Sequence, residues 1–158
     1  MFLINKYGFI KPLTPIDYVT EYINSEIVKW LEKGKYETST AYQARVNESS
    51  RKKKLEELSN NAVQMVAPKF CDLKNITTEY DADNQTFKIN AKGLPPFYVK
   101  VPVTEAESFD KSIASIQFQN TQFALGKDNR FFLQKATVKN PNNGKVYNFS
   151  STDQAVLA

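Results

Sequence analysis

The chain has 158 residues, of which 41% are hydrophobic and 24% are charged, and its formal net charge is +4 at pH 7. A chain of this length buries roughly 70% of its unfolded surface as one domain, so it needs neither disulfides nor a metal to fold, and this composition excludes a disordered chain. The positive charge is spread thinly, because residues 14–66 carry eight basic and eight acidic side chains, and a nucleic-acid partner is therefore disfavoured.

The first residues, MFLINKYGFIKPLTP, do not match a secretory signal. Asn5 and Lys6 interrupt the apolar run, which reaches about 7 to 15 residues in a signal peptide, and no small-residue cleavage pattern follows. No stretch of the chain approaches the ~20 apolar residues of a membrane span. We therefore expect a soluble chain with no membrane span and no signal peptide.

Residues 14–33 predict the first helix. Apolar residues recur there at spacings of three and four, which places Ile16, Val19, Ile23, Ile27 and Trp30 on one face. Thr14 and Asp17 have the spacing of a capping box at the start. Lys33 and Gly34 are expected to close the helix, with Gly34 in the left-handed conformation.

A second helix is expected from about Thr38 to Val66, before Pro68. Its apolar pattern changes midway, because Tyr42 and Val46 share one face whereas the later apolar residues lie on nearly the opposite face. This later stripe consists of Leu55, Leu58, Ala62, Met65 and Val66. Eight polar residues separate the two faces, so either the helix is interrupted there or its other side packs on a second partner.

From about residue 73 the pattern becomes that of strands. Phe87, Ile89 and Ala91 alternate with polar neighbours, as half-buried strands do. Turn residues separate the predicted strands at 81–84, 93–96, 126–129 and 141–144. Connections this short favour antiparallel hairpins, and a slip in the alternation at Asn120 and Thr121 predicts either a bulge or a second strand there.

One short helix is expected to interrupt the strands near residues 104–114, where Thr104 and Glu107 have capping-box spacing. The order of elements predicts a single α+β domain over residues 1–158. In this fold a helical hairpin, residues 14–66, packs on an antiparallel sheet of about five to six strands within residues 73–150.

The residue inventory is poor in catalytic chemistry. The chain contains no histidine, which excludes Ser-His-Asp and Cys-His catalysis and histidine-assisted zinc sites. It contains one cysteine, Cys71, which we interpret as a buried or half-buried filler because no neighbour would lower its pKa. We therefore predict no catalytic residue, no metal ligand and no cofactor, and we infer no small-molecule ligand.

The segment DADN, residues 81–84, places oxygen atoms at alternate positions, as in a calcium loop. The glycine and the glutamate that such a loop requires are replaced by Thr86 and Lys92. We therefore favour a hairpin turn, in which aspartate and asparagine side chains bond to their own backbone.

The one charge run is RKKK, which makes Arg51, Lys52, Lys53 and Lys54 the candidate interaction residues. Binding of phosphate groups is one interpretation of this run. However, Lys52 and Lys53 stand four residues before Glu56 and Glu57, within reach for pairing on a helix. A solvated helix face is therefore the favoured interpretation.

The stretch WLEKGKYETSTAYQARV connects the two predicted helices. Its large side chains are explained by a structural corner formed by Trp30, Gly34, Tyr36, Glu37, Tyr42 and Arg45. Arg45 lies one turn into the second helix, where its guanidinium can pair with Glu37 or reach the last carbonyls of the first helix. We predict that Arg45 locks the corner.

The pattern W-x-x-K-G-K-Y-E-T-S-x-x-Y-x-x-R-V-N-E, followed by EYDADNQTF and VPVTEAESF, resembles a family of uncharacterised Bacteroidota proteins. In that family a helical hairpin with a similar aromatic-Gly-Glu-Tyr-Arg motif precedes a β-rich half. The resemblance spans about residues 18–150. It implies an envelope-associated setting, such as the periplasm, and it implies no catalytic activity.

Three functional hypotheses follow. The first is a non-enzymatic interaction or structural module, which binds a protein partner or a second copy of itself through the two-faced second helix. The second is binding of a polyanion, either nucleic acid or an acidic glycan, through Arg51 to Lys54 and the lysines of the late strands. The third is a hydrolase that uses two paired carboxylates, since seventeen acidic residues leave many combinations open.

Overall fold

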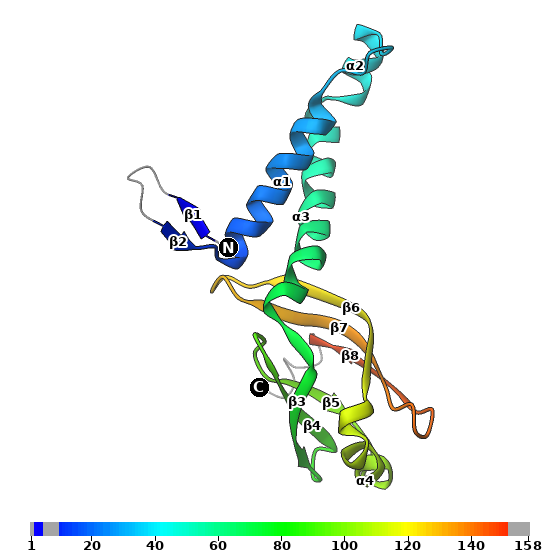
Figure 1. The fold of residues 1–158 in the computed structure, drawn as a ribbon. Helices are drawn as coiled ribbons and strands as arrows, with labels where there is room; N and C mark the ends of the chain where they lie inside the picture. Colours follow the sequence, from blue (N-terminus) through cyan, green and yellow to red (C-terminus); the bar gives the residue numbers. More distant parts are fainter. Residues whose placement is uncertain (1, 5–9, 152–158) are drawn as a thin grey trace. The chain divides into compact units, whose positions relative to one another are not determined.

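A computed structural model of the chain describes residues 2–4 and 10–151, and Figure 1 shows the fold. The contacts between residues divide the chain into two units, Met1–Val66, here called the helical unit, and Ala67–Ala158, here called the β unit. This boundary falls between the helical part and the β-rich part that the sequence predicts. Asn5 and Lys6, on which the expectation about a signal peptide rests, lie outside the described residues.

The helical unit begins with two short strands, which pair antiparallel and which the sequence does not predict. Three helices follow. The elements are β1 (Phe2–Ile4), β2 (Ile10–Pro12), α1 (Pro15–Leu31), α2 (Ser39–Arg45) and α3 (Glu48–Phe70), whose last residues belong to the β unit.

The start of α1 follows the capping pattern in the sequence. The carboxylate of Asp17 accepts hydrogen bonds from the backbone N–H and the hydroxyl of Thr14, both at 2.9 Å. The predicted end of this helix is wrong, because α1 ends at Leu31 and its C-cap is Glu32 in an extended conformation. Gly34 has no positive φ. Its N–H instead donates to Glu37 Oε1 at 3.0 Å, so the chain leaves the helix without a left-handed residue.

The second predicted helix is interrupted. It ends at Arg45, Val46 is extended, and α3 begins at Glu48, which is the first of the two alternatives left open by the sequence. The predicted end at Val66 is also wrong, because α3 continues to Phe70 with Pro68 inside it. A proline inside a helix cannot donate to the carbonyl four residues earlier, and Pro68 stands two residues before the end of α3.

Few side chains of the helical unit are buried. The buried hydrophobic residues among its described side chains are Val19, Leu58, Ala62 and Val66. The remaining members of the two predicted apolar stripes are partly buried or exposed, and Ile16, Leu55 and Met65 are exposed. The described side chains of residues 13–66 therefore form a thin core.

The β unit contains six strands. They are β3 (Asp72–Asp81), β4 (Thr86–Lys92), β5 (Phe97–Lys100), β6 (Gln117–Leu125), β7 (Phe131–Lys139) and β8 (Val146–Ser150). The order β3-β4-β5 forms one antiparallel sheet and the order β6-β7-β8 forms another. The α+β class and the number of strands are as predicted, but the strands form two three-stranded sheets where the sequence predicts one sheet. Packing of the helices on a sheet stays a prediction.

The inserted helix α4 (Val103–Lys111) is followed by a single 3₁₀ turn, η1 (Ile113–Ser115), close to the predicted range. The predicted capping box at Thr104 is wrong, because the N-cap is Pro102. Gln85 replaces it, since its side-chain oxygen accepts a hydrogen bond from the N–H of Val103 at 3.1 Å. A residue eighteen positions earlier in the chain therefore caps this helix.

Aromatic rings fill the core of the β unit. The rings of Phe87 and Phe109 stack at 4.6 Å, and Tyr147 meets Phe109 edge-on at 5.6 Å. The Tyr147 hydroxyl donates to Glu105 at 2.9 Å, and burial, followed by this bond, raises the pKa of Tyr147 to about 12. Aromatic pairs of this kind add to the stabilisation from burial, so this unit has a dense core.

Local geometry in the β unit agrees with two details of the sequence. The pairing of β6 with β7 shifts register between Gln119 and Gln122, and Asn120 has φ 51°, which is the predicted bulge. Gly93 has φ +83°, and a Cβ atom there would lie 1.9 Å from the carbonyl oxygen of Phe70, so only glycine fits.

Among the helices of the described residues, none combines the length and the apolar character of a membrane span.

Candidate functional site

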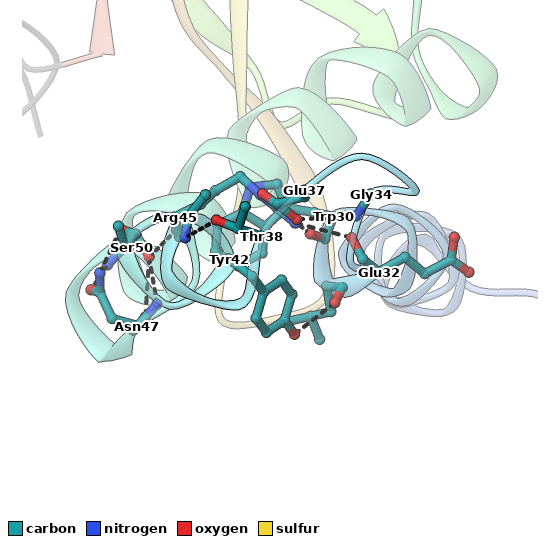
Figure 2. Close-up of polar contacts among 12 residues, drawn as sticks. Trp30, Glu32, Gly34, Glu37, Thr38, Tyr42, Arg45, Asn47 and Ser50 are labelled. Atoms are coloured by element: carbon teal, nitrogen blue, oxygen red, sulfur yellow. Dashed lines mark hydrogen bonds and ion pairs between the residues drawn. The ribbon is translucent and has the colours of Figure 1, made fainter.

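The turn between α1 and α2 is held by a two-bond ion pair, shown in Figure 2. Arg45 Nε donates to Glu37 Oε2 at 2.7 Å, and Arg45 Nη2 donates to Glu37 Oε1 at 3.0 Å. The planar guanidinium matches the two carboxylate oxygens, and this geometry makes such pairs stronger and more specific than single-bond pairs. Glu37 and Arg45 therefore hold one another in a single orientation.

Arg45 also binds the end of α1. Its Nη1 donates to the carbonyl of Trp30 at 2.5 Å, and its Nη2 donates to the carbonyl of Glu32 at 3.0 Å. The last carbonyls of a helix have no partner within the helix and carry the negative end of its dipole, so a cation is favourable there. Arg45 thus makes both contacts that the sequence suggests as alternatives.

Two aromatic rings lie against this guanidinium. Arg45 Cζ is 5.6 Å from the centre of the Trp30 ring and 5.5 Å from that of the Tyr42 ring, within the range of cation–π attraction. The Tyr42 hydroxyl donates to the carbonyl of Leu31 at 2.8 Å. Trp30 and Tyr42 are therefore members of the corner through both their rings and their polar atoms.

The corner also fixes the charge of Glu37. The bonds from Arg45, followed by the bond from the N–H of Gly34, lower the pKa of Glu37 from 4.5 to about 2. The pKa of Arg45 is raised in return, mainly by its bond to Glu37. Both groups stay charged over the physiological pH range, so the pair is suited to support and not to proton transfer.

Tyr36 differs from the other predicted corner residues. The residue is 90% exposed, and its ring lies 5.4 Å from Nζ of its chain neighbour Lys35. Its assignment to the corner is therefore wrong. Gly34 belongs to the corner through its backbone N–H alone.

A second lock joins α2 to α3, and sequence reasoning missed it. The N–H of Ser50 donates to Asn47 Oδ1 at 3.0 Å, and the N–H of Asn47 donates to Ser50 Oγ at 2.9 Å. The Ser50 hydroxyl also donates to the carbonyl of Arg45 at 2.7 Å. Asparagine followed by serine three residues later is a capping pattern, and this signal within the polar stretch would have placed the break.

The candidate interaction residues Arg51 to Lys54 lie in the first turns of α3, directly after this lock. Lys54 pairs with Glu57 at 3.4 Å. The predicted pairs of Lys52 with Glu56 and of Lys53 with Glu57 do not form among the described residues. Three of the four cations are therefore left without an ionic partner in that part of the chain.

A groove of about 920 Å³ lies in the β unit, between the start of β3 and the start of β6. Its charged lining residues are Lys69, Asp72, Lys74 and Lys92. Asp72 is the one acid among the described lining residues, so the two carboxylates of a glycosidase-type site do not meet there. Hydrogen bonds from Asn75, followed by the N–H of Lys74, lower the pKa of Asp72, which keeps it ionised.

Cys71 also lines this groove. Burial raises its pKa to about 11, so the thiolate that a nucleophile requires is scarce at neutral pH. Its thiol lies 3.8 Å from the carbonyl oxygen of Gly93, to which it donates. This environment suits a filler residue.

The DADN segment forms a turn between β3 and β4. Asp81 Oδ1 accepts from the N–H groups of Asp83 and Asn84 at 3.0 and 3.2 Å, and Asp81 Oδ2 accepts from the Asn84 side chain at 2.7 Å. Both oxygens of Asp81 are thus used within the turn. Across residues 2–4 and 10–151, no group of three or more acidic or cysteine side chains is arranged to hold a metal ion.

Comparison of the chain with models of protein families, with curated proteins and with solved structures finds no match. The resemblance to the Bacteroidota family, and the envelope-associated setting that it implies, stay predictions.

Proposed function

We propose that the protein is a non-enzymatic interaction module, in which α1 and α3 form a helical hairpin whose apolar faces are completed by a second copy of the chain. The observation that carries this proposal is the mismatch between apolar and buried surface in the helical unit. Among the described side chains of that unit, four hydrophobic ones are buried, whereas Ile16, Val28, Leu55 and Met65 are 43%, 57%, 39% and 58% exposed.

The locked corner supports a hairpin. Arg45, Tyr42 and Ser50 tie the end of α1 to α2 and the end of α2 to the start of α3, so the chain is held where it reverses. Two helices joined in this way contact each other along a narrow apolar stripe. In an isolated pair, the apolar side chains beside that stripe stay exposed to solvent. Packing against further helices, as in a four-helix bundle, covers such side chains.

The stripe on α3 has the spacing that such packing uses. Leu55, Leu58, Ala62 and Met65 follow one another at intervals of three, four and three residues. Leu58 and Ala62 are buried, while Leu55 and Met65 at the two ends of this set are exposed. A second copy would cover the exposed ends.

Light scattering after size exclusion, over a series of protein concentrations, tests this proposal. We expect a dimer that dissociates on dilution and is lost in the double variant Leu55→Gln, Met65→Gln. The matched control is Val103→Gln, Val146→Gln, which removes two side chains that are 53% and 51% exposed in the β unit. A wild-type chain that is monomeric at every concentration, or a dimer lost only in the control, would reject the proposal.

A second candidate function is binding of a polyanion through Arg51 to Lys54. The observation that favours it is the absence of ionic partners for Arg51, Lys52 and Lys53 among the described residues. Affinity for heparin should then fall steeply as salt is added, because counterions are released on binding. An absence of heparin binding at low ionic strength would end this candidate.

A further inference from the structure

The charges of the helical unit are separated along its length, although they cancel over residues 14–66. We call residues 30–54, around the corner, the tip, and residues 14–29 together with 55–66 the shaft. The charged residues of the tip are Lys33, Lys35, Arg45, Arg51, Lys52, Lys53 and Lys54, against Glu32, Glu37 and Glu48. Those of the shaft are Lys29, against Asp17, Glu21, Glu26, Glu56 and Glu57. The tip is therefore strongly positive and the shaft strongly negative.

The corner is what gathers the positive charge at one end. Arg45 contacts the carbonyls of Trp30 and Glu32 and the side chain of Glu37, and Ser50 contacts Arg45. Arg51 to Lys54 follow within the first two turns of α3, less than about 10 Å from its start at 1.5 Å per residue. Because Arg45 and Glu37 neutralise each other, their pairing leaves the excess on the tip unchanged.

Neither the helix dipole nor pairing within a helix stabilises this separation of charges along the helical unit. The start of a helix carries the positive end of its dipole, so four consecutive cations at the start of α3 are unfavourable there. Local pairing offsets little of this: outside the corner, Lys54 pairs with Glu57 and Lys29 pairs with Glu26. Both are exposed pairs, which stabilise weakly.

A second copy offers the complementary charges. If two helical units pair antiparallel, the tip of each lies beside the shaft of the other, and one two-fold axis satisfies both contacts at once. A parallel pair would instead place tip beside tip and shaft beside shaft. The exposed apolar residues are identical in the two arrangements, so the charges decide between them.

We infer that the helical unit binds a second copy antiparallel, with the positive tip of each chain against the negative shaft of the other. This inference rests on the proposed function, which supplies the apolar contact, and it adds the orientation. The charges determine the orientation and register of the two copies, while the apolar side chains supply most of the surface buried between them.

Charge reversal tests the orientation. The tip variant is Lys52→Glu, Lys53→Glu, and the shaft variant is Glu21→Lys, Glu56→Lys. Each alone should weaken the dimer by about tenfold or more, because the changed tip or shaft then has no net charge and the attraction between tip and shaft is lost. Mixing the two variants should restore association in part, because the mixed dimer regains one contact between an unchanged tip and an unchanged shaft. In a parallel dimer neither variant alone would weaken association, since tip would still face tip.

The matched control is Lys127→Glu, Lys145→Glu, which changes the net charge as much as the tip variant does but at exposed positions of the β unit. Its dimer should be unchanged. Circular dichroism checks that each variant is helical, and the salt dependence of the wild-type dimer gives a result without any variant. Added salt should weaken an antiparallel dimer and strengthen a parallel one.

The possible failures are distinguishable. A wild-type dimer whose affinity is insensitive to both salt and charge reversal would overturn the antiparallel inference and leave the proposed function standing. Heparin binding at the tip, together with a dimer affinity that charge reversal does not change, would also overturn the antiparallel inference and leave the proposed function standing. A chain that never associates would overturn both.

Discussion

The two units of this chain differ in the interactions that stabilise them. The β unit stacks aromatic rings, among them Phe87, Phe109 and Tyr147, in a core of buried side chains. In the helical unit, four of the described hydrophobic side chains are buried, and hydrogen bonds and an ion pair hold its corner. A unit with a dense core can be stable alone, whereas one with a thin core needs a partner for its apolar surface.

The largest expected effect lies in the β unit. Phe109→Ala removes a side chain with 0% exposure, and it should lower the free energy of unfolding by about 3 to 5 kcal/mol. Urea unfolding followed by circular dichroism measures this loss. Val28→Ala, at a position of α1 that is 57% exposed, is the comparison and should change the free energy by less than about 0.5 kcal/mol in the monomer. Equal losses would remove the contrast between the two units.

The next effect concerns the corner. Arg45→Ala removes the donor to the Glu37 carboxylate and to the carbonyls of Trp30 and Glu32, and it should lower the melting temperature by about 3 °C or more. Trp30, the chain's one tryptophan, lies against Arg45 and reports this melting by fluorescence. Arg45→Lys should recover only part of the loss, because an ammonium group cannot make the two-bond pair.

The control for this experiment is Arg51→Ala, which removes the same type of side chain from a position without an ion pair among the described residues. Its melting temperature should stay within about 1 °C of the wild type. A melting curve of Arg45→Ala that overlays the wild type would contradict the role of the corner.

The smallest effect is a difference in pH dependence. The pKa of Glu37 is lowered to about 2 from an ordinary value of 4.5, so its pairing stabilises the folded chain above pH 4.5 and is lost as the pH falls through about 2. In Glu37→Gln this contribution is absent at every pH. The melting temperature read from Trp30 should therefore fall less steeply between pH 4.5 and 2 in the variant, and parallel curves would exclude the pairing.

Local chemistry was readable in the sequence. The capping contacts of Thr14 and Asp17 join residues three positions apart. The pair of Arg45 and Glu37 joins residues eight positions apart, which is still a short separation in sequence. The prediction that Gly34 ends α1 in the left-handed conformation is wrong. The N–H of Gly34 donates to the Glu37 carboxylate instead. The side chain of Gln85 decides the start of α4 from eighteen positions away, and no local pattern contains that contact.

The strands of the β unit form two sheets, and this division and the groove depend on which strands pair. The alternation of apolar and polar residues along one strand carries no information on its partners. The charge separation was hidden for another reason. A count over residues 14–66 averages the tip with the shaft, and the contacts of Arg45, Tyr42 and Ser50 that define the corner are not visible in such a count.

Hydrogen exchange at low and high protein concentration tests most directly whether a second copy covers the helical unit. Amides of α1 and of α3 between Leu55 and Val66 should exchange more slowly as concentration rises, while those of β4 and β7 in the β unit should not change. Exchange in α1 and α3 that is the same at every concentration would contradict the account.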